Sequence, residues 1–234
     1  QKIAGELEAI GIQMEQVMDC IEQAFRESVY QDTLSYFDVG GDAVVYINAA
    51  RTIVVKKLKG TNKDVIRGKT MKPADGYNLA QRYLGLLVIR FLRLDNLKVR
   101  LRGKDGSIKD EIFEEAVVQK YVPVFFKEGI VDNSLKGRRY VGILAEAIEE
   151  GDIETAKLLL DDFLMSIRAS FSRKIVDRDI KTENYGYDPS VGHIGSLDMG
   201  KFLENYELNI QQARVFLRNL MCARDAVYEW TRLI

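Results

Sequence analysis

The chain has 234 residues and is 47% hydrophobic, which is enough apolar material for one compact domain or two small lobes. Its 34 Lys and Arg residues nearly balance its 35 Asp and Glu residues, so the net charge of -1 gives no overall positive field for binding nucleic acid. The two cysteines and the single histidine argue against a disulfide framework, a histidine- or cysteine-rich metal site and histidine-based catalysis.

Apolar runs and cysteine content also bear on the cellular location of the protein. The longest apolar runs, residues 86–89 and 122–126, are far too short to span a bilayer. No secretory signal peptide is visible, and a low cysteine content is typical of the reducing cytosol, so a cytoplasmic protein is expected. Cys20 and Cys222 are expected to be buried, inert thiols.

Residues 3–29 have the pattern of a long amphipathic helix. Apolar side chains recur in alternating steps of four and three residues, at Ile3, Leu7, Ile10, Met14, Val17, Ile21 and Ala24. The same spacing defines a heptad seam, through which helices of different chains pair. The helix is therefore expected either to dock on its own domain or to form a homodimer or pair with a partner helix.

Three short β-rich runs follow, with turn-like residues between them. They cover residues 34–39, 43–48 and 51–58 and are separated by Gly40-Gly41-Asp42 and by Asn48-Ala49-Ala50. The pattern predicts an antiparallel meander of three strands. Residues 60–73 are polar and are expected to form a loose connection.

A second helix and two more strands are predicted in the rest of the first half. Residues 76–94 are apolar almost all round, which predicts a largely buried helix. Residues 97–103 and 115–122 have the composition of strands and are joined by a polar stretch with a turn at 103–107. The first half is thus predicted to be a unit of five strands and one helix.

The second half is predicted to be mainly helical. Helices are expected over residues 138–150, 152–174, 200–207 and 209–232, with a short strand at 193–198. Asp152, followed by Thr155, is a typical start for the second of these helices. The order of elements predicts an α+β fold with two lobes. Its parts are an N-terminal amphipathic helix at 1–30, a β-rich lobe at 31–122 and a helical lobe at 123–234.

A few polar residues have the side chains that phosphoryl transfer needs. Asp179, Lys181 and Asn184 form the pattern D-x-K-x-x-N, Asp198 follows in Asp198-Met199-Gly200, and Lys56 ends an apolar strand. Phosphoryl transfer depends on positioning and charge neutralisation more than on covalent chemistry. Asp179 could accept the proton of an attacking hydroxyl, and Lys181 could neutralise the γ-phosphate. The oxygens of Asn184 and Asp198 suit Mg²⁺, and Lys56 could hold the α- and β-phosphates.

These residues resemble the protein-kinase-like superfamily. Its catalytic loop, H-R-D-[LI]-K-x-x-N, is similar to Asp177-Arg178-Asp179-Ile180-Lys181-Thr182-Glu183-Asn184, and its D-F-G is similar to Asp198-Met199-Gly200. Residues 53–58 resemble the family's V-A-I-K strand, and residues 116–122 resemble the strand and hinge that border the adenine. The resemblance covers residues 34–200 and implies ATP and Mg²⁺ as cofactors. It also implies that Gln119, Tyr121 and the turn glycines Gly40 and Gly41 contact the nucleotide.

The chain departs from the family pattern at several conserved features of that family. Asp177 stands where the family has the histidine of H-R-D, a position that is usually architectural. Only Gly40-Gly41 remains of the glycine-rich loop that cradles phosphates. No A-P-E segment follows Gly200, so the usual activation segment and substrate-docking helices are not expected. The resemblance is therefore to a small, atypical kinase of the bacterial type.

The lysine on the strand also lacks its usual partner. Residues 57–95 contain no glutamate, so Gln81 or Asp75 could take its place beside that lysine, and the sequence assigns neither. Lys57 is an alternative to Lys56. Strand alternation favours Lys56, because it shares a face with the neighbouring apolar residues at positions 54 and 58.

Three functions are compatible with these observations. The first is an ATP- and Mg²⁺-dependent kinase that phosphorylates a hydroxyl of a protein Ser or Thr or of a small molecule; Lys181 is typical of the protein-kinase branch. The second is a pseudokinase that binds nucleotide or a partner without turnover, with residues 3–29 as the interaction surface. The third is an α+β binding module in which residues 177–184 are a solvated loop. If the chain is an effector, the cytosol of a host is the alternative location.

Overall fold

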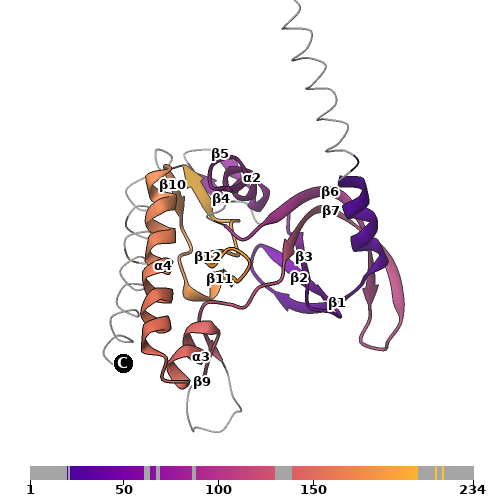
Figure 1. Ribbon diagram of the computed structural model, residues 1–234. Helices are drawn as coiled ribbons and strands as arrows, with labels where there is room; N and C mark the ends of the chain where they lie inside the picture. The colour runs from indigo at the N-terminus through magenta and orange to yellow at the C-terminus, as the bar shows by residue number, and fades with distance from the viewer. Residues whose placement is uncertain are drawn as a thin grey trace, which may run out of the picture.

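The computed structural model describes residues 20, 22–60, 64–66, 69–85, 88–129, 139–204, 214 and 218. These residues form an α+β fold in which a β-barrel stands beside a group of helices and short hairpins (Figure 1). The α+β class is as the sequence predicts. None of the helices in this part of the chain is both long and apolar enough to cross a membrane.

Five strands of the first half close into a barrel in the order β1-β2-β3-β7-β6. They are β1 (Thr33–Val39), β2 (Ala43–Asn48), β3 (Ile53–Leu58), β6 (Phe91–Arg102) and β7 (Ile108–Lys120). Neighbouring strands are antiparallel, except that β1 and β6 pair in parallel and so close the barrel. One face of these strands forms an apolar core that includes Leu34, Val55, Phe113 and Val118. The predicted meander of three strands is confirmed.

The predicted helix over residues 76–94 is wrong beyond Tyr83. Helix α2 (Pro73–Tyr83) starts with a proline, which lacks the N–H that a first helical turn leaves unpaired. It ends just before Gly85, whose φ of 51° lies in the left-handed region. The chain then enters β6, which pairs with β7 along its length. An apolar run suits a buried helix and a buried strand equally well, and only the pairing with β7 separates the two.

Two further predictions are corrected by strands of three residues. The connection over residues 60–73 contains an antiparallel hairpin of β4 (Asp64–Ile66) and β5 (Lys69–Met71). The predicted helix over residues 200–207 is wrong at β13 (Phe202–Glu204), which pairs with β10 (Ile175–Asp177). Such short strands show no period-two pattern, so their partners alone define them.

Two of the four helices predicted for the second half lie in its described residues, and one of them is shorter than predicted. Helix α4 (Ile153–Ser172) starts after Asp152, whose carboxylate accepts the N–H of Thr155 at 3.0 Å and so caps the helix. Helix α3 (Ile143–Glu149) covers only the end of the predicted 138–150 helix, because β9 (Arg139–Val141) pairs with β8 (Lys127–Gly129) before it. The predicted helix at 209–232 lies outside the described residues except for 214 and 218, which are helical.

Helices α3 and α4 share an apolar core with a hairpin that carries part of the candidate site. The hairpin consists of β11 (Tyr185–Asp188) and β12 (His193–Ser196), which includes the strand predicted at 193–198. Phe163 of α4 stacks on Phe125 with ring centroids 4.7 Å apart, and Tyr185 meets Phe163 edge-on at 4.9 Å. This packing fixes β11 immediately after the polar loop that precedes it.

The described end of the N-terminal helix docks on the barrel. Residues 22–31 are helical, Arg26 donates to the carbonyl of Asp95 at 3.0 Å, and the Tyr30 hydroxyl donates to Asp110 at 2.7 Å. Docking on its own domain is thus seen for these residues, while residues 3–19 lie outside the described part and their dimer or partner role stays a prediction. Cys20 is exposed, so the expectation of a buried thiol is wrong there; Cys222 lies outside the described residues.

A third apolar core joins the barrel to the second half through α2. It contains Ala74, Tyr77 and Ala80 of α2, Val117 of β7, and Met199 near the candidate site. Gly76 lies at the closest approach, because a Cβ atom at this position would stand 2.0 Å from the carbonyl oxygen of Met199. Helix α2 therefore packs directly against the segment that contains Asp198.

Gly76→Ala is expected to lower the free energy of unfolding by about 2 kcal/mol or more, because the added methyl group must displace main-chain atoms. Chemical denaturation monitored by circular dichroism measures this change. Asn78→Ala, on the exposed side of the same helix, is the matched control and should change stability by less than about 0.5 kcal/mol. Equal effects of the two variants would contradict the close approach of α2 to Met199.

Candidate functional site

The loop between β10 and β11 is organised around Asp179. The ammonium of Lys181 lies 2.9 Å from the Asp179 carboxylate, and the Asn184 side-chain nitrogen donates to the Asp179 carbonyl at 2.9 Å and its carboxylate at 3.2 Å. The single turn η2 (Thr182–Asn184) brings Asn184 back toward Asp179. The hydrogen bond to Asp179 raises the pKa of Lys181, so the ammonium stays charged. The three residues of the D-x-K-x-x-N pattern thus converge.

Asp177 holds this loop against β11 through two hydrogen bonds. Its buried carboxyl accepts the N–H of Asp179 at 2.8 Å and the hydroxyl of Tyr185 at 3.1 Å. Burial raises the pKa of Asp177 from its ordinary value of 3.8 to about 7, and the nearby charges of Asp179 and Asp198 act in the same direction. The residue at the family's histidine position therefore ties Asp179 to β11.

The raised pKa of Asp177 makes the stability of the fold depend on pH. A carboxyl whose pKa rises on folding binds its proton more tightly in the folded state, so the free energy of unfolding falls from about pH 4 to about pH 7. At about 1.4 kcal/mol per pKa unit, the decrease amounts to a few kcal/mol. Asp177→Asn is expected to flatten this slope, as measured by denaturation at several pH values.

Asp161→Asn, which alters an exposed carboxylate on α4, is the control and should keep the wild-type slope. An unchanged slope in Asp177→Asn would contradict a titration of Asp177 in this range. The asparagine can still accept the N–H of Asp179, so the loop is expected to remain folded in the variant.

Lys56 of β3 reaches the same region from the barrel. Its ammonium is buried, donates to the carbonyl of Leu197, and donates to the hydroxyl of Tyr77 at 3.3 Å. That hydroxyl in turn donates to the carboxylate of Asp198 at 3.3 Å. Burial lowers the pKa of Lys56, while the charge of Asp198 opposes this effect. In the described part of the chain, Asp198 reaches Lys56 through Tyr77 rather than by a direct ion pair.

The alternatives to Lys56 and to its missing glutamate partner lie elsewhere. Lys57 points away and forms an ion pair with Glu111 at 2.7 Å. Asp75 accepts the N–H of Lys72 at 2.7 Å and so caps the start of α2, while Gln81 is exposed. The α2 residue that contacts the lysine is therefore Tyr77, which no motif in the sequence marks. Its only sequence signal is its place on the buried face of the helix.

Asn184 and Asp198 come together through the main chain. The N–H of Leu197 donates to the carbonyl of Asn184 at 2.7 Å, which places Asp198 beside the loop. One carboxylate oxygen of Asp198 accepts the N–H of Gly200 at 3.1 Å. The remaining donor atoms available to a cation are the other carboxylate oxygen and the amide oxygen of Asn184.

This donor set fits Mg²⁺ only in combination with a ligand. The described residues contain no group of three His, Cys, Asp or Glu side chains arranged to hold a metal. Mg²⁺ commonly uses one or two protein carboxylates together with substrate phosphates, instead of a cage made by protein alone. A Mg²⁺ ion at Asn184 and Asp198 would therefore need further oxygen ligands, such as those of a phosphate.

The turn between β1 and β2 is joined to the segment after Asp198 by an ion pair. Asp42 is buried, and its carboxylate lies 3.2 Å from the ammonium of Lys201. The N–H of Gly40 donates to the carbonyl of Ala43 at 2.9 Å and is thus used within the turn. A nucleotide role for Gly40 and Gly41 stays a prediction. The sequence gives no signal that Asp42 faces Lys201, since the two are far apart in the chain.

Gln119 and Tyr121 lie at the end of β7. Gln119 is buried and donates from its side chain to the carbonyl of Ile89 at 3.4 Å, and the N–H of Tyr121 donates to the carbonyl of Thr52 at 2.9 Å. Next to them, Lys120 forms an ion pair with Asp188 at 2.6 Å. Burial raises the pKa of Asp188, but hydrogen bonds from Lys120 and Ser190 outweigh this effect and lower the pKa to about 2. This ion pair links the end of the barrel to β11.

The residues predicted as a site thus fall into two groups. Asp179, Lys181 and Asn184 meet in the loop, and Lys56 meets Asp198 through Tyr77. The glycine turn lies near the second group, whereas Gln119 and Tyr121 lie at the strand end that leads to the second half. Comparison with models of protein families gives no match for the chain, and no curated protein matches its sequence.

Proposed function

We propose that the chain is a phosphotransferase of the protein-kinase-like type, which uses ATP and Mg²⁺ and transfers the γ-phosphate to a hydroxyl group. The observation that carries this proposal is the environment of Lys56. Its buried ammonium has a carbonyl and a hydroxyl as partners, and the carboxylate of Asp198 stands one hydrogen bond further away. Burying a cation without a direct counter-ion is costly, so such a position favours an anionic ligand.

The surrounding groups suit the phosphates of a nucleotide. Lys56 would bind the α- and β-phosphates, while Asn184 and Asp198 would hold Mg²⁺. Bound Mg²⁺ would neutralise phosphate charge. Asp179 would accept the proton of the attacking hydroxyl, and Lys181, already 2.9 Å from Asp179, would stabilise charge on the γ-phosphate.

The residues of the proposed site come from two parts of the chain, which is consistent with the two-lobed design of kinases. The lysine comes from the barrel, whereas the loop and Asp198 come from the second half, with α2 between them. Under this proposal residues 31–122 act as the nucleotide lobe and residues 123–234 as the catalytic lobe. The adenine would lie against the segment that contains Gln119 and Tyr121.

A pseudokinase is the second candidate, and one contact favours it. The ion pair between Asp42 and Lys201 places a carboxylate where the family uses backbone N–H groups to bind phosphates. Because Lys201 already pairs with Asp42, this turn presents a neutralised ion pair to a phosphate in place of N–H donors, which weakens phosphate binding. Nucleotide would then bind weakly, and the chain would act by binding a partner.

The test combines nucleotide binding with turnover in the wild-type chain. Mg-ATP is expected to raise the melting temperature, and ADP release or labelling of added hydroxyl acceptors is expected to follow. A rise in melting temperature without any phosphate transfer identifies the pseudokinase. No effect of ATP, with or without Mg²⁺, identifies the plain binding module and overturns the proposal.

A further inference from the structure

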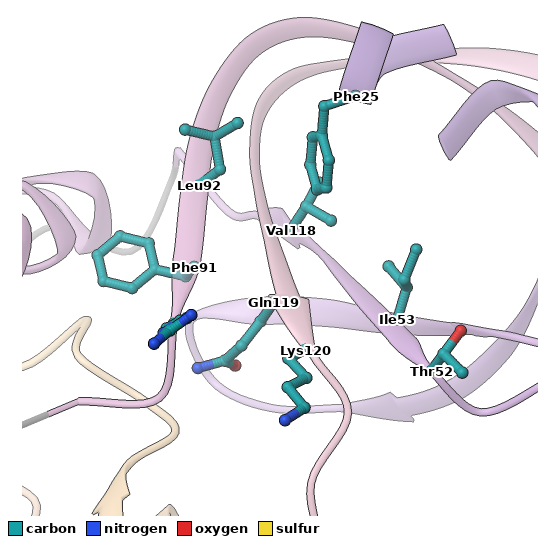
Figure 2. A pocket seen from close by; sticks show the side chains of 9 residues that line it. Phe25, Thr52, Ile53, Phe91, Leu92, Val118, Gln119 and Lys120 are labelled. Atoms are coloured by element: carbon teal, nitrogen blue, oxygen red, sulfur yellow. The ribbon is translucent and has the colours of Figure 1, made fainter. Parts of the chain in front are cut away.

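A cavity of about 400 Å³ opens at one end of the barrel, next to helical residues 22–31. Figure 2 shows Phe25 reaching from the helix toward Val118 of β7, with Leu92 of β6 on one side and Ile53 of β3 on the other. The described residues that line the cavity include neither Lys56 nor the loop that contains Asp179. The cavity shares Gln119 with the segment against which the adenine would lie, but none of the groups proposed to bind the phosphates or Mg²⁺. The ligand inferred below therefore goes beyond the proposed function.

The cavity has an apolar end and a polar end. Phe25, Ile53 and Leu92 pack against the apolar core of the barrel. At the other end, away from Phe25, lie the amide of Gln119 and the ammonium of Lys120 (Figure 2). A binding partner with one apolar part and one polar part fits this layout.

The charge at the polar end is positive. Arg90 also lines the cavity, is exposed, and forms no ion pair with any residue that the structure describes. Lys120, by contrast, is neutralised by Asp188 at 2.6 Å. Arg90 is thus the cation that remains available to a ligand, and its guanidinium suits a carboxylate because it can donate two parallel hydrogen bonds.

We propose that this cavity binds a medium-chain fatty acid, with the hydrocarbon tail against Phe25, Ile53 and Leu92 and the carboxylate on Arg90. The volume lies at the lower end of the usual range for small-molecule sites, roughly 300–1,000 Å³. At the packing density of protein interiors it accommodates roughly ten to fifteen carbon atoms. A saturated acyl chain of about ten carbons is therefore the matching ligand.

Calorimetric titration of the full chain with decanoate, below its micelle concentration, tests the proposal. One molecule of decanoate is expected to bind per chain, and octanoate is expected to bind about tenfold more weakly because two methylene groups are lost. Decanol and decyltrimethylammonium separate the contribution of the charge. Both are expected to bind at least about tenfold more weakly than decanoate, because they cannot pair with Arg90.

Two variants locate the ligand. Arg90→Gln is expected to weaken decanoate binding by about tenfold and to leave decanol binding unchanged. Ile53→Trp fills the apolar end and is expected to abolish binding of both compounds. Arg102→Gln, an exposed arginine at the far end of β6, is the matched control and should bind decanoate normally.

Three results would overturn the proposal. They are the absence of saturable decanoate binding, equal affinity for decyltrimethylammonium and decanoate, and wild-type decanoate affinity in Arg90→Gln. Because Arg90 is exposed, its substitution is not expected to impair folding, so this last result is decisive even if Ile53→Trp is unstable. Mg-ATP titrations of the same variants separate this site from the nucleotide site, and they are expected to match the wild type.

Discussion

Replacing Asp179 with asparagine is expected to slow phosphate transfer by about 10²–10⁴, the usual contribution of a positioned general base. The carboxylate lies 2.9 Å from Lys181 and accepts a hydrogen bond from Asn184 at 3.2 Å. Asparagine keeps an oxygen in this position but cannot take up the proton of an attacking hydroxyl. The turnover number should therefore fall while the affinity for Mg-ATP is retained. Rates of ADP release and of phosphate incorporation measure the effect.

Glu183→Gln is the matched control for this prediction, because Glu183 is an exposed carboxylate in the same loop. Its turnover should stay within about twofold of the wild type, since surface substitutions usually change little. Wild-type turnover in Asp179→Asn would exclude Asp179 as the base. A fall of equal size in both variants would indicate that the general charge of the loop, and not the position of Asp179, determines the rate.

Asp198→Asn is expected to remove the Mg²⁺-dependent part of ATP binding. Asparagine can still accept the hydroxyl of Tyr77 and the N–H of Gly200, so the local structure should be kept, while the only carboxylate of the proposed cation site is lost. The affinity for ATP with Mg²⁺ should fall by at least about tenfold, as expected when a charged ligand of a cation is removed. In the presence of a chelator, the wild type and the variant should bind ATP equally.

Titration of a fluorescent ATP analogue with and without Mg²⁺ measures both affinities. Asp161→Asn, on the exposed face of α4, changes the net charge equally and should leave both affinities as in the wild type. A variant Asp198→Asn that keeps the full effect of Mg²⁺ would rule out Asp198 as a metal ligand. In that case the proposed positions of Lys56 and Asp179 around Mg-ATP would have to be revised as well.

The fold illustrates which parts of a sequence determine their own structure. The meander at residues 34–58 was predictable because its turns and β-rich runs are local signals. The strand β6 was not predictable, because its apolar run also fits a buried helix until its pairing with β7 is known. The short strands β10 and β13 depend on each other across a long stretch of chain.

The candidate site shows the same division. The loop residues Asp179, Lys181 and Asn184 lie within one short segment and form a recognisable motif, and the structure brings their side chains together. Tyr77 could not be identified as the partner of Lys56, because tyrosine on the buried face of a helix is usually part of the core. The contact between Asp42 and Lys201 joins a turn of the barrel to the second half and leaves no pattern in the sequence.

The sequence by itself determined the local units: the meander, the capped helix α4 and the polar loop with its three converging side chains. The tertiary structure alone decided that the barrel closes, that Lys56 is buried beside Leu197, and that Tyr77 connects it to Asp198. The physical reason is range. Helical and strand periods reflect neighbours within a few residues, whereas these contacts depend on apolar packing between segments that only the folded chain brings together.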